Sequence, residues 1–221
     1  MRKLTGAVFQ SLDGIMQAPG GPQEDPTGGF GLGGWSFDFW DESMSVPADE
    51  LFEQSDYDLL LGRRTYDIFA AYWPYNQDIP IGAKFQRIDK YVLTHSDAPL
   101  SWEHSYKLSG DTAQSVAQLK RSEGRDLLIQ GSSTLYPALL SAELIDRLLL
   151  MTFPVLLGHG KSIFDGTQRP GRMKLTRHFV SDSGVIFATY EPAGAVPIGS
   201  FETKPPSEAE LARRAAMAQE A

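Results

Sequence analysis

The sequence predicts an α/β fold with a mixed, mostly parallel sheet that ends in an antiparallel edge. Over the first two thirds of the chain, short apolar runs alternate with segments of helical character. Parallel strands joined by crossover helices have this pattern. After residue 144 the strand-like runs follow one another without helices between them. This change favours antiparallel pairing at the C-terminal edge of the sheet.

Each expected element rests on a local pattern. Strands are expected at residues 3–10, 56–62, 89–96, 125–131, 145–158, 173–182 and 184–192, where apolar residues gather between turn signals. Helices are expected at residues 46–55, 63–73, 111–123 and 133–144. Asp111 or Thr112 suits the N-cap of the third helix, and Pro74 ends the second. The Ser-Asp-Ser-Gly sequence at 181–184 predicts a hairpin turn.

The chain is expected to form one domain over residues 1–192, followed by an arm or tail over residues 193–221. Its 221 residues suffice for one domain with a sizeable core. Beyond residue 192 core residues become rare until an Ala-rich segment that suits a solvated helix. The segment 11–46, rich in Gly, Pro and aromatic residues, is too long for an ordinary connection, so we expect it to be functional.

Composition excludes several classes of function. The net charge of −8 argues against nucleic acid as a partner, because phosphate-backbone binding needs a basic surface. The absence of cysteine excludes disulfides and thiolate catalysis, and the four scattered histidines predict no metal site. The N-terminus has no long apolar core, which predicts neither a signal peptide nor a membrane anchor. We expect a cytoplasmic protein that acts on a small molecule and does not contact a membrane.

Three glycines in the long segment, Gly29, Gly31 and Gly34, spell the G-x-G-x-x-G of dinucleotide-binding Rossmann folds. That motif requires a strand before it and a helix after it, and the flanking sequence favours neither. We therefore expect these glycines to form a mobile flap beside a pocket. Trp35 and Trp40 lie in this flap and are candidates for contact with a substrate.

The second expected strand runs into Gly62, Arg63, Arg64 and Thr65, which begin a helix. The free N–H groups of a helix start favour an anion, and guanidinium groups add charge-assisted donors. Cations at a helix N-terminus also oppose the helix dipole. An anionic partner explains two arginines there better than an ordinary surface helix does.

Two further strands end in similar chemistry. Thr94, His95 and Ser96 close the third strand with short donors, although polar residues are common at strand ends. Gly131 permits close approach to the backbone and precedes three hydroxyl residues at a helix start. Because these ends share one edge of the sheet, we expect a single phosphate-bearing cofactor to cross it.

In these motifs and their order the chain resembles the dihydrofolate-reductase-like superfamily. The closest branch is related to the reductase domain of the bifunctional riboflavin-biosynthesis deaminase–reductase. The segments that carry the resemblance run from residue 3 to about 201: SLDG, LLLGRRTYDIF, YWP, GSSTL, LIDRLLLMTFPVLLGHGKSIF and YEPAG. It implies a three-layer DHFR-like fold and a homodimer. It also implies NADPH-dependent reduction of a small pterin- or aminopyrimidine-like heterocycle or of a carbonyl substrate.

The resemblance further implies which residues hold NADPH. By position they are Ser11, Asp13 and Gly14 in the flap, Gly62, Arg63, Arg64 and Thr65 at the adenine-side phosphates, Leu93, Thr94, His95 and Ser96 beside the adenosine, and Gly131, Ser132, Ser133, Thr134 and Leu135 under the pyrophosphate. Many relatives have a second glycine where this chain has Ser132. Close approach at that turn therefore depends on Gly131.

Reduction of a C=N bond needs a proton on nitrogen, for which a pocket carboxylate is suited. The Val-Pro-Ala-Asp at 46–49 resembles the Leu-Pro-Ala-Asp with which dihydrofolate reductases place such a carboxylate, and it nominates Asp49. The interval from Asp49 to Gly62 is shorter than in those enzymes. A solvated helix-start Asp49 therefore stays an open interpretation, with Asp13 and Asp41 as alternative donors.

Two interpretations from other classes of protein also stay open. One is a non-catalytic protein of the same fold that binds NADPH for sensing. The other is a scaffold whose C-terminal tail mediates assembly.

Overall fold

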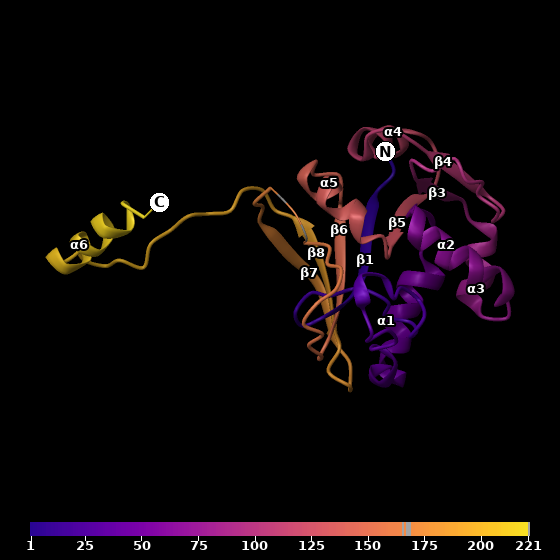
Figure 1. Cartoon of the computed structure of the whole chain (residues 1–221), viewed down its shortest axis with the longest axis horizontal. Coiled ribbons are helices and arrows are strands. Elements are labelled where there is room, and N and C mark those ends of the chain that lie inside the picture. The colour runs from indigo at the N-terminus through magenta and orange to yellow at the C-terminus, as the bar shows by residue number, and fades with distance from the viewer. Residues whose placement is uncertain (165, 167–168, 221) are drawn as a thin grey trace.

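The computed structural model describes residues 1–164, 166 and 169–220. Within these ranges, eight strands form a single sheet in the order β4-β3-β2-β5-β1-β6-β8-β7 (Figure 1). The six strands from β4 to β6 are parallel. β8 and β7 run antiparallel at the other edge. The predicted class of fold is therefore confirmed.

The elements have these bounds. The strands are β1 (Leu4–Ser11), β2 (Tyr57–Gly62), β3 (Lys90–Leu93), β4 (Ser105–Leu108), β5 (Asp126–Gln130), β6 (Arg147–Phe153), β7 (Met173–Val180) and β8 (Ile186–Pro192). The α-helices are α1 (Ser45–Asp49), α2 (Arg63–Tyr72), α3 (Pro80–Arg87), α4 (Thr112–Arg121), α5 (Tyr136–Ser141) and α6 (Glu208–Met217). The single helical turns are η1 (Thr27–Gly29), η2 (Phe37–Phe39), η3 (Glu42–Met44), η4 (Glu50–Gln54), η5 (Trp73–Tyr75) and η6 (Ser133–Leu135).

All the strands and helices expected from the sequence form, most of them shorter than expected. The β7–β8 hairpin also forms, with Gly184 N donating to Ser181 O at 3.0 Å. Sequence patterns missed two elements, α3 and β4. α3 contains Gly82, which weakens helix propensity but is needed because a Cβ there would lie 2.1 Å from Asn76 O. β4 is a four-residue edge strand, too short and too exposed to have a clear alternation.

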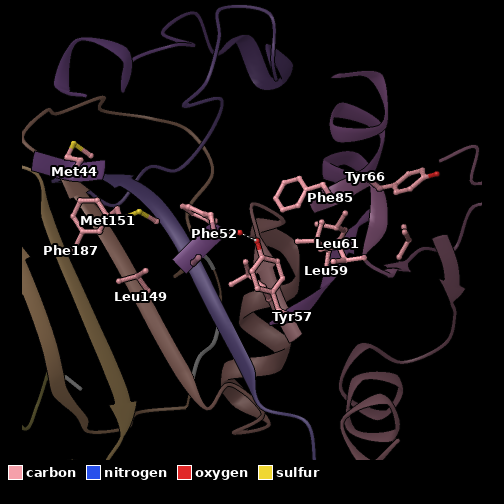
Figure 2. Packing of buried hydrophobic residues seen from close by; sticks show 14 of the residues in the cluster. Met44, Phe52, Tyr57, Leu59, Leu61, Tyr66, Phe85, Leu149, Met151 and Phe187 are labelled. Atoms are coloured by element: carbon pink, nitrogen blue, oxygen red, sulfur yellow. Dashed lines mark hydrogen bonds between the residues drawn. The ribbon is translucent and has the colours of Figure 1, made fainter. Parts of the chain in front are cut away.

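The sheet lies between two apolar clusters because successive side chains of a strand point to opposite faces. On β2, Leu59 and Leu61 belong to one cluster and Leu60 to the other. α1, α2 and α3 cover the first cluster, and α4 and α5 cover the second. Figure 2 shows part of the first, where Tyr57 Oη donates to Phe52 O at 2.7 Å. This arrangement gives the three layers that the resemblance implied.

Beyond β8 the chain leaves the sheet as an extended segment that ends in α6 (Figure 1). No residue of α6 is buried. Ser207 caps the helix by accepting a hydrogen bond from Glu210 N at 3.3 Å. Among the described residues, no helix combines the length and the apolar character needed to cross a membrane.

Candidate functional site

Two of the predicted anion-binding turns are locked together at the carboxyl ends of β2 and β5. These strands are parallel neighbours, so the start of α2 lies beside η6. Ser132 Oγ accepts a hydrogen bond from Gly62 N at 2.9 Å, and Thr65 Oγ1 accepts one from Ser132 N at 2.9 Å. The sequence therefore brings these two turns together, and their own hydroxyl groups fix their relative position.

A contact within the fold also requires a glycine at position 131. Gly131 has a φ of +67°, and a Cβ there would lie 2.9 Å from Thr65 Cγ2. The side chain of Thr65 thus lies too close to leave room for a larger residue at this position. Ser132 also lies in the left-handed region, at φ +59°. This conformation is strained for serine, but it directs the hydroxyl group to Gly62 N.

The residues of η6 divide into two groups. Ser133 is half-buried and Thr134 is exposed, so their hydroxyl groups lie at the surface of the edge. The side chain of Leu135 lies in the second apolar cluster, as does that of Leu93 at the end of β3. These two leucines therefore anchor the turns after β5 and β3 in the apolar core.

The two arginines at the start of α2 contact different neighbours. Arg63 Nε donates to both carboxylate oxygens of Asp67 at 2.9 and 3.0 Å, and its Nη1 donates to Ala98 O at 2.8 Å. Arg64 Nη1 donates to Thr27 Oγ1 at 2.9 Å and to Asp25 Oδ1 at 3.2 Å. One guanidinium group thus lies toward the segment after β3, and the other toward the flap.

The end of β3 adjoins Arg63 through the segment 94–98. Thr94 is buried, and its Oγ1 accepts a hydrogen bond from Ser96 N at 3.0 Å. Ser96 Oγ accepts one from Ala98 N at 3.1 Å, while His95 is exposed. The short donors of this segment shape its turn and place Ala98 O against Arg63.

The start of the flap is fixed to the segment after β6. Ser11, fully buried, donates its hydroxyl proton to Asp13 Oδ1 at 2.5 Å. Asp13 also accepts hydrogen bonds from Gly158 N at 2.6 Å and from Leu157 N at 3.2 Å. These bonds, from Ser11 first and then Gly158, hold the pKa of Asp13 below its usual range. Gly14 completes the turn at φ +80°.

Aromatic side chains of the flap gather over the carboxyl ends of β1 and β6. The ring of Trp35 lies 5.3 Å from Phe153 at 87°, and that of Trp40 lies 5.6 Å from Phe9 at 59°. Trp35 Nε1 donates to Gln17 O at 2.8 Å, which fixes its ring. Trp40 is 42% exposed and keeps surface free for a ligand. Phe9 and Phe153 were not predicted, because apolar residues in strands give no functional signal.

The three carboxylates considered as proton donors differ in their surroundings. Asp41 caps η3, where bonds from Ser43 and then Ser183 lower its pKa to about 2. Asp13 is held as an anion in the flap turn. Asp49 ends α1 and is half-buried, and its carboxylate makes no hydrogen bond with the part of the chain that is described. Asp49 is thus the one of the three whose carboxylate is not committed to a turn or cap.

No group of three or more His, Asp or Glu residues is placed to hold a metal ion in the ranges that the structure describes. An open hollow of about 460 Å³ lies at the other end of the sheet, near the amino ends of β1, β5 and β6. It lies away from the carboxyl ends of these strands, although Pro47, Glu50 and Leu51, which flank Asp49, also line it. We therefore place the candidate site at the carboxyl edge, where the residues with donor groups converge.

The mostly parallel sheet with one antiparallel edge and helices on both faces is a dihydrofolate-reductase-like α/β fold. The chain belongs to the RibD C-terminal domain family, whose model matches residues 2–187. Both the family and the fold implied by the sequence motifs are thereby confirmed. Family membership supports a function of the reductase type.

The chain is also similar to one curated relative and to solved structures that share its fold. The uncharacterized protein YyaP of Bacillus subtilis (strain 168) is 24% identical over 136 residues, which cover 60% of this chain and 72% of YyaP. A putative riboflavin biosynthesis protein from Shewanella sp. PV-4 has a similar structure, with a TM-score of 0.65, 19% identity and coverage of 87% of this chain and 99% of that one. Dihydrofolate reductase from Enterococcus faecalis, complexed with NADP(H) and RAB-propyl, has a TM-score of 0.54, 16% identity and coverage of 86% and 96%.

Proposed function

We propose that this protein is an NADPH-dependent reductase that transfers hydride to a small pterin- or aminopyrimidine-like heterocycle or to a carbonyl substrate. The observation that carries the proposal is the lock between the turn at Gly62–Thr65 and the turn at Gly131–Ser132, with hydrogen bonds of 2.9 Å. The lock holds the helix start at Arg63 and the hydroxyl residues after Gly131 side by side at one edge of the sheet. Membership of the RibD C-terminal domain family supports this function.

The donor groups at this edge fit the parts of NADPH. The start of α2, with Ser133 and Thr134 beside it, suits the pyrophosphate, because free helix N–H groups and hydroxyl groups favour phosphate oxygens. Arg63 and the segment 94–98 suit the adenosine and its 2′-phosphate. The flap with Trp35 and Trp40 suits the nicotinamide and the substrate. The cofactor would supply the hydride at that end.

We assign the proton to Asp49. Hydride addition to the carbon of a C=N bond leaves a nitrogen that must be protonated. The carboxylates of Asp13 and Asp41 are already occupied by hydrogen bonds from the turn and the cap that they hold, which leaves them poorly placed to face a substrate. The flap aromatics cover the strand ends and would keep water from the reacting atoms.

The assignment of Arg63 gives the first test, a fluorescence titration of purified protein with NADPH and NADH in parallel. Arg63→Ala is expected to weaken NADPH binding roughly ten- to hundredfold and NADH binding much less, because one charged hydrogen bond to the 2′-phosphate is lost. Arg64→Ala is the matched control. Its guanidinium contacts Asp25 and Thr27, so the two cofactors should be affected equally.

The outcomes separate the candidate functions. Equal losses for both cofactors in Arg63→Ala would remove this arginine from the 2′-phosphate site. If the unaltered protein bound neither cofactor, the enzymatic proposal would lose its basis. Tight NADPH binding without oxidation by pterins, aminopyrimidines or quinones would favour a sensing protein over a reductase.

We further propose that residues 193–221 form an arm, separate from the reductase domain of residues 1–192, that joins two copies into a homodimer. Val196, Ile198 and Phe201 expose large apolar side chains on the extended segment, an arrangement that favours a protein partner. A hollow of about 490 Å³, with an apolar floor that includes Leu148 and Leu150, begins where this segment leaves β8.

Light scattering tests the arm. The full chain is expected to have the mass of a dimer, and a chain that ends at Pro192 the mass of a monomer. In the full chain, Ile198→Ser with Phe201→Ser should have the same effect as truncation, because both side chains are exposed and can be exchanged without disturbing the core. An unchanged mass in both variants would show that the arm does not join the two copies.

A further inference from the structure

A buried carboxylate, Asp25, connects three segments at the candidate site. Its side chain is 9% exposed and pairs with Arg64 of α2 at 3.2 Å and with Lys161 of the segment after β6. Thr27 Oγ1 donates to Asp25 Oδ1 at 2.5 Å and accepts a hydrogen bond from Lys161 Nζ at 3.0 Å. We call these four residues, Asp25, Thr27, Arg64 and Lys161, the flap latch.

The flap latch extends to the aromatic residues through one glutamine. Gln17 is buried, and its Nε2 donates to the backbone oxygens of Asp25 at 2.9 Å and Thr27 at 2.8 Å. Gln17 Oε1 accepts from Lys161 N at 3.1 Å, and Gln17 O accepts from Trp35 Nε1 at 2.8 Å. Hydrogen bonds of Gln17 therefore connect the backbone that carries Asp25 and Thr27 with the ring of Trp35.

The charges explain why Asp25 is central to this arrangement. Arg64 and Lys161 both contact Asp25 and Thr27, so two cations lie close together around one anion. Burial raises the pKa of Asp25, but the bonds from Lys161 and Thr27 outweigh it and keep the pKa below its usual range. Without the carboxylate the cations would repel each other across the junction of flap and sheet.

We propose that Asp25 is a positioning residue that keeps the flap closed over the carboxyl edge of the sheet. Its carboxylate joins the flap to α2 and to the segment after β6, and Gln17 connects the backbone of this residue with Trp35. The consequence for hydride transfer rests on the proposed function. The closed position of the flap does not require a bound cofactor, so it can be tested independently of that function.

Hydrogen exchange of the cofactor-free protein tests the closure. The reporters are two amides that join the flap to the segment after β6, Met16 N bonded to Lys161 O at 2.8 Å and Lys161 N bonded to Gln17 Oε1 at 3.1 Å. In Asp25→Asn their exchange is expected to be faster by roughly tenfold or more, because charged hydrogen bonds that hold the flap are lost. Asp38→Asn is the matched control, since it removes one exposed carboxylate from the same flap. That control should leave exchange unchanged.

Two further variants make the test specific to the pairing of charges. Asp25→Glu keeps the carboxylate and should retain most of the protection. Adding Arg64→Ala to Asp25→Asn removes one of the two repelling cations, so the double variant should exchange more slowly than Asp25→Asn alone. If Asp25→Asn fails to fold, Lys161→Gln takes its place, with faster exchange of the same amides expected.

The kinetic measurement separates this proposal from the proposed function. With a substrate that the protein reduces, Asp25→Asn should lower kcat roughly tenfold, because Trp35 is displaced. Binding of 2′,5′-ADP at the Arg63 end should stay within about twofold. Unchanged flap exchange in Asp25→Asn, or an equal change in Asp38→Asn, would overturn the proposal. Faster exchange in a protein that binds no NADPH would uphold the flap latch and reject the reductase.

Discussion

Replacing Asp58 by alanine is expected to lower the free energy of unfolding by about 3–5 kcal/mol, because a buried ion pair loses one partner. Asp58 lies on β2 with its side chain 3% exposed. It pairs with Arg2, just before β1, at 2.6 Å and with Arg125, just before β5, at 3.1 Å. The side chain of Arg2 is 2% exposed, so its guanidinium would be left buried without a counter-charge.

Urea unfolding of Asp58→Ala and of Asp97→Ala measures this effect with a matched control. Asp97 pairs with Lys107 at 2.9 Å, but its carboxylate is fully exposed, and exposed pairs contribute little. The double variant Asp58→Ala with Arg2→Met should recover part of the loss, because an apolar side chain replaces the unpaired charge. A loss of unfolding free energy below about 1 kcal/mol in Asp58→Ala would show that this carboxylate does not hold the amino ends of β1, β2 and β5 together.

The sequence predicted the turns of the candidate site because their chemistry is local. Gly62 to Thr65 and Gly131 to Ser132 each follow an apolar strand directly, and parallel strands bring their carboxyl ends to one edge. Strand order then places β2 beside β5, which the sequence pattern alone did not specify. The lock between Thr65 and Ser132 depends on this adjacency and was therefore not foreseen.

The partners of the two arginines could not be predicted from sequence for a geometric reason. Successive residues of a helix point about 100° apart, so Arg63 and Arg64 face different neighbours whatever their common charge suggests. The neighbours come from distant parts of the chain: Ala98 lies 35 residues after Arg63, and Asp25 lies 39 residues before Arg64. Asp25 carried no local signal, because an acidic residue in a Gly- and Pro-rich segment is common.

Gly131→Ala is expected to cost about 2–4 kcal/mol of unfolding free energy and to weaken NADPH binding more than any change outside the site. The residue has a φ of +67°, which an alanine adopts only under strain, and the added Cβ would lie 3.1 Å from Thr65 Oγ1. This oxygen accepts the hydrogen bond from Ser132 N that locks the two turns. Pushing Thr65 away therefore separates the groups proposed to hold the pyrophosphate.

Gly194→Ala separates backbone strain from the contact with Thr65. Gly194 has a φ of +86° and no atom within 4 Å of the position of a Cβ, and it lies outside the candidate site. Gly194→Ala should therefore lower the free energy of unfolding by the backbone strain alone, about 1–2 kcal/mol. It should bind NADPH as the unaltered protein does. Unfolding by urea and NADPH titration of both variants measure the difference. If Gly131→Ala bound NADPH as tightly as Gly194→Ala, the locked turns would be a structural joint with no part in holding the cofactor.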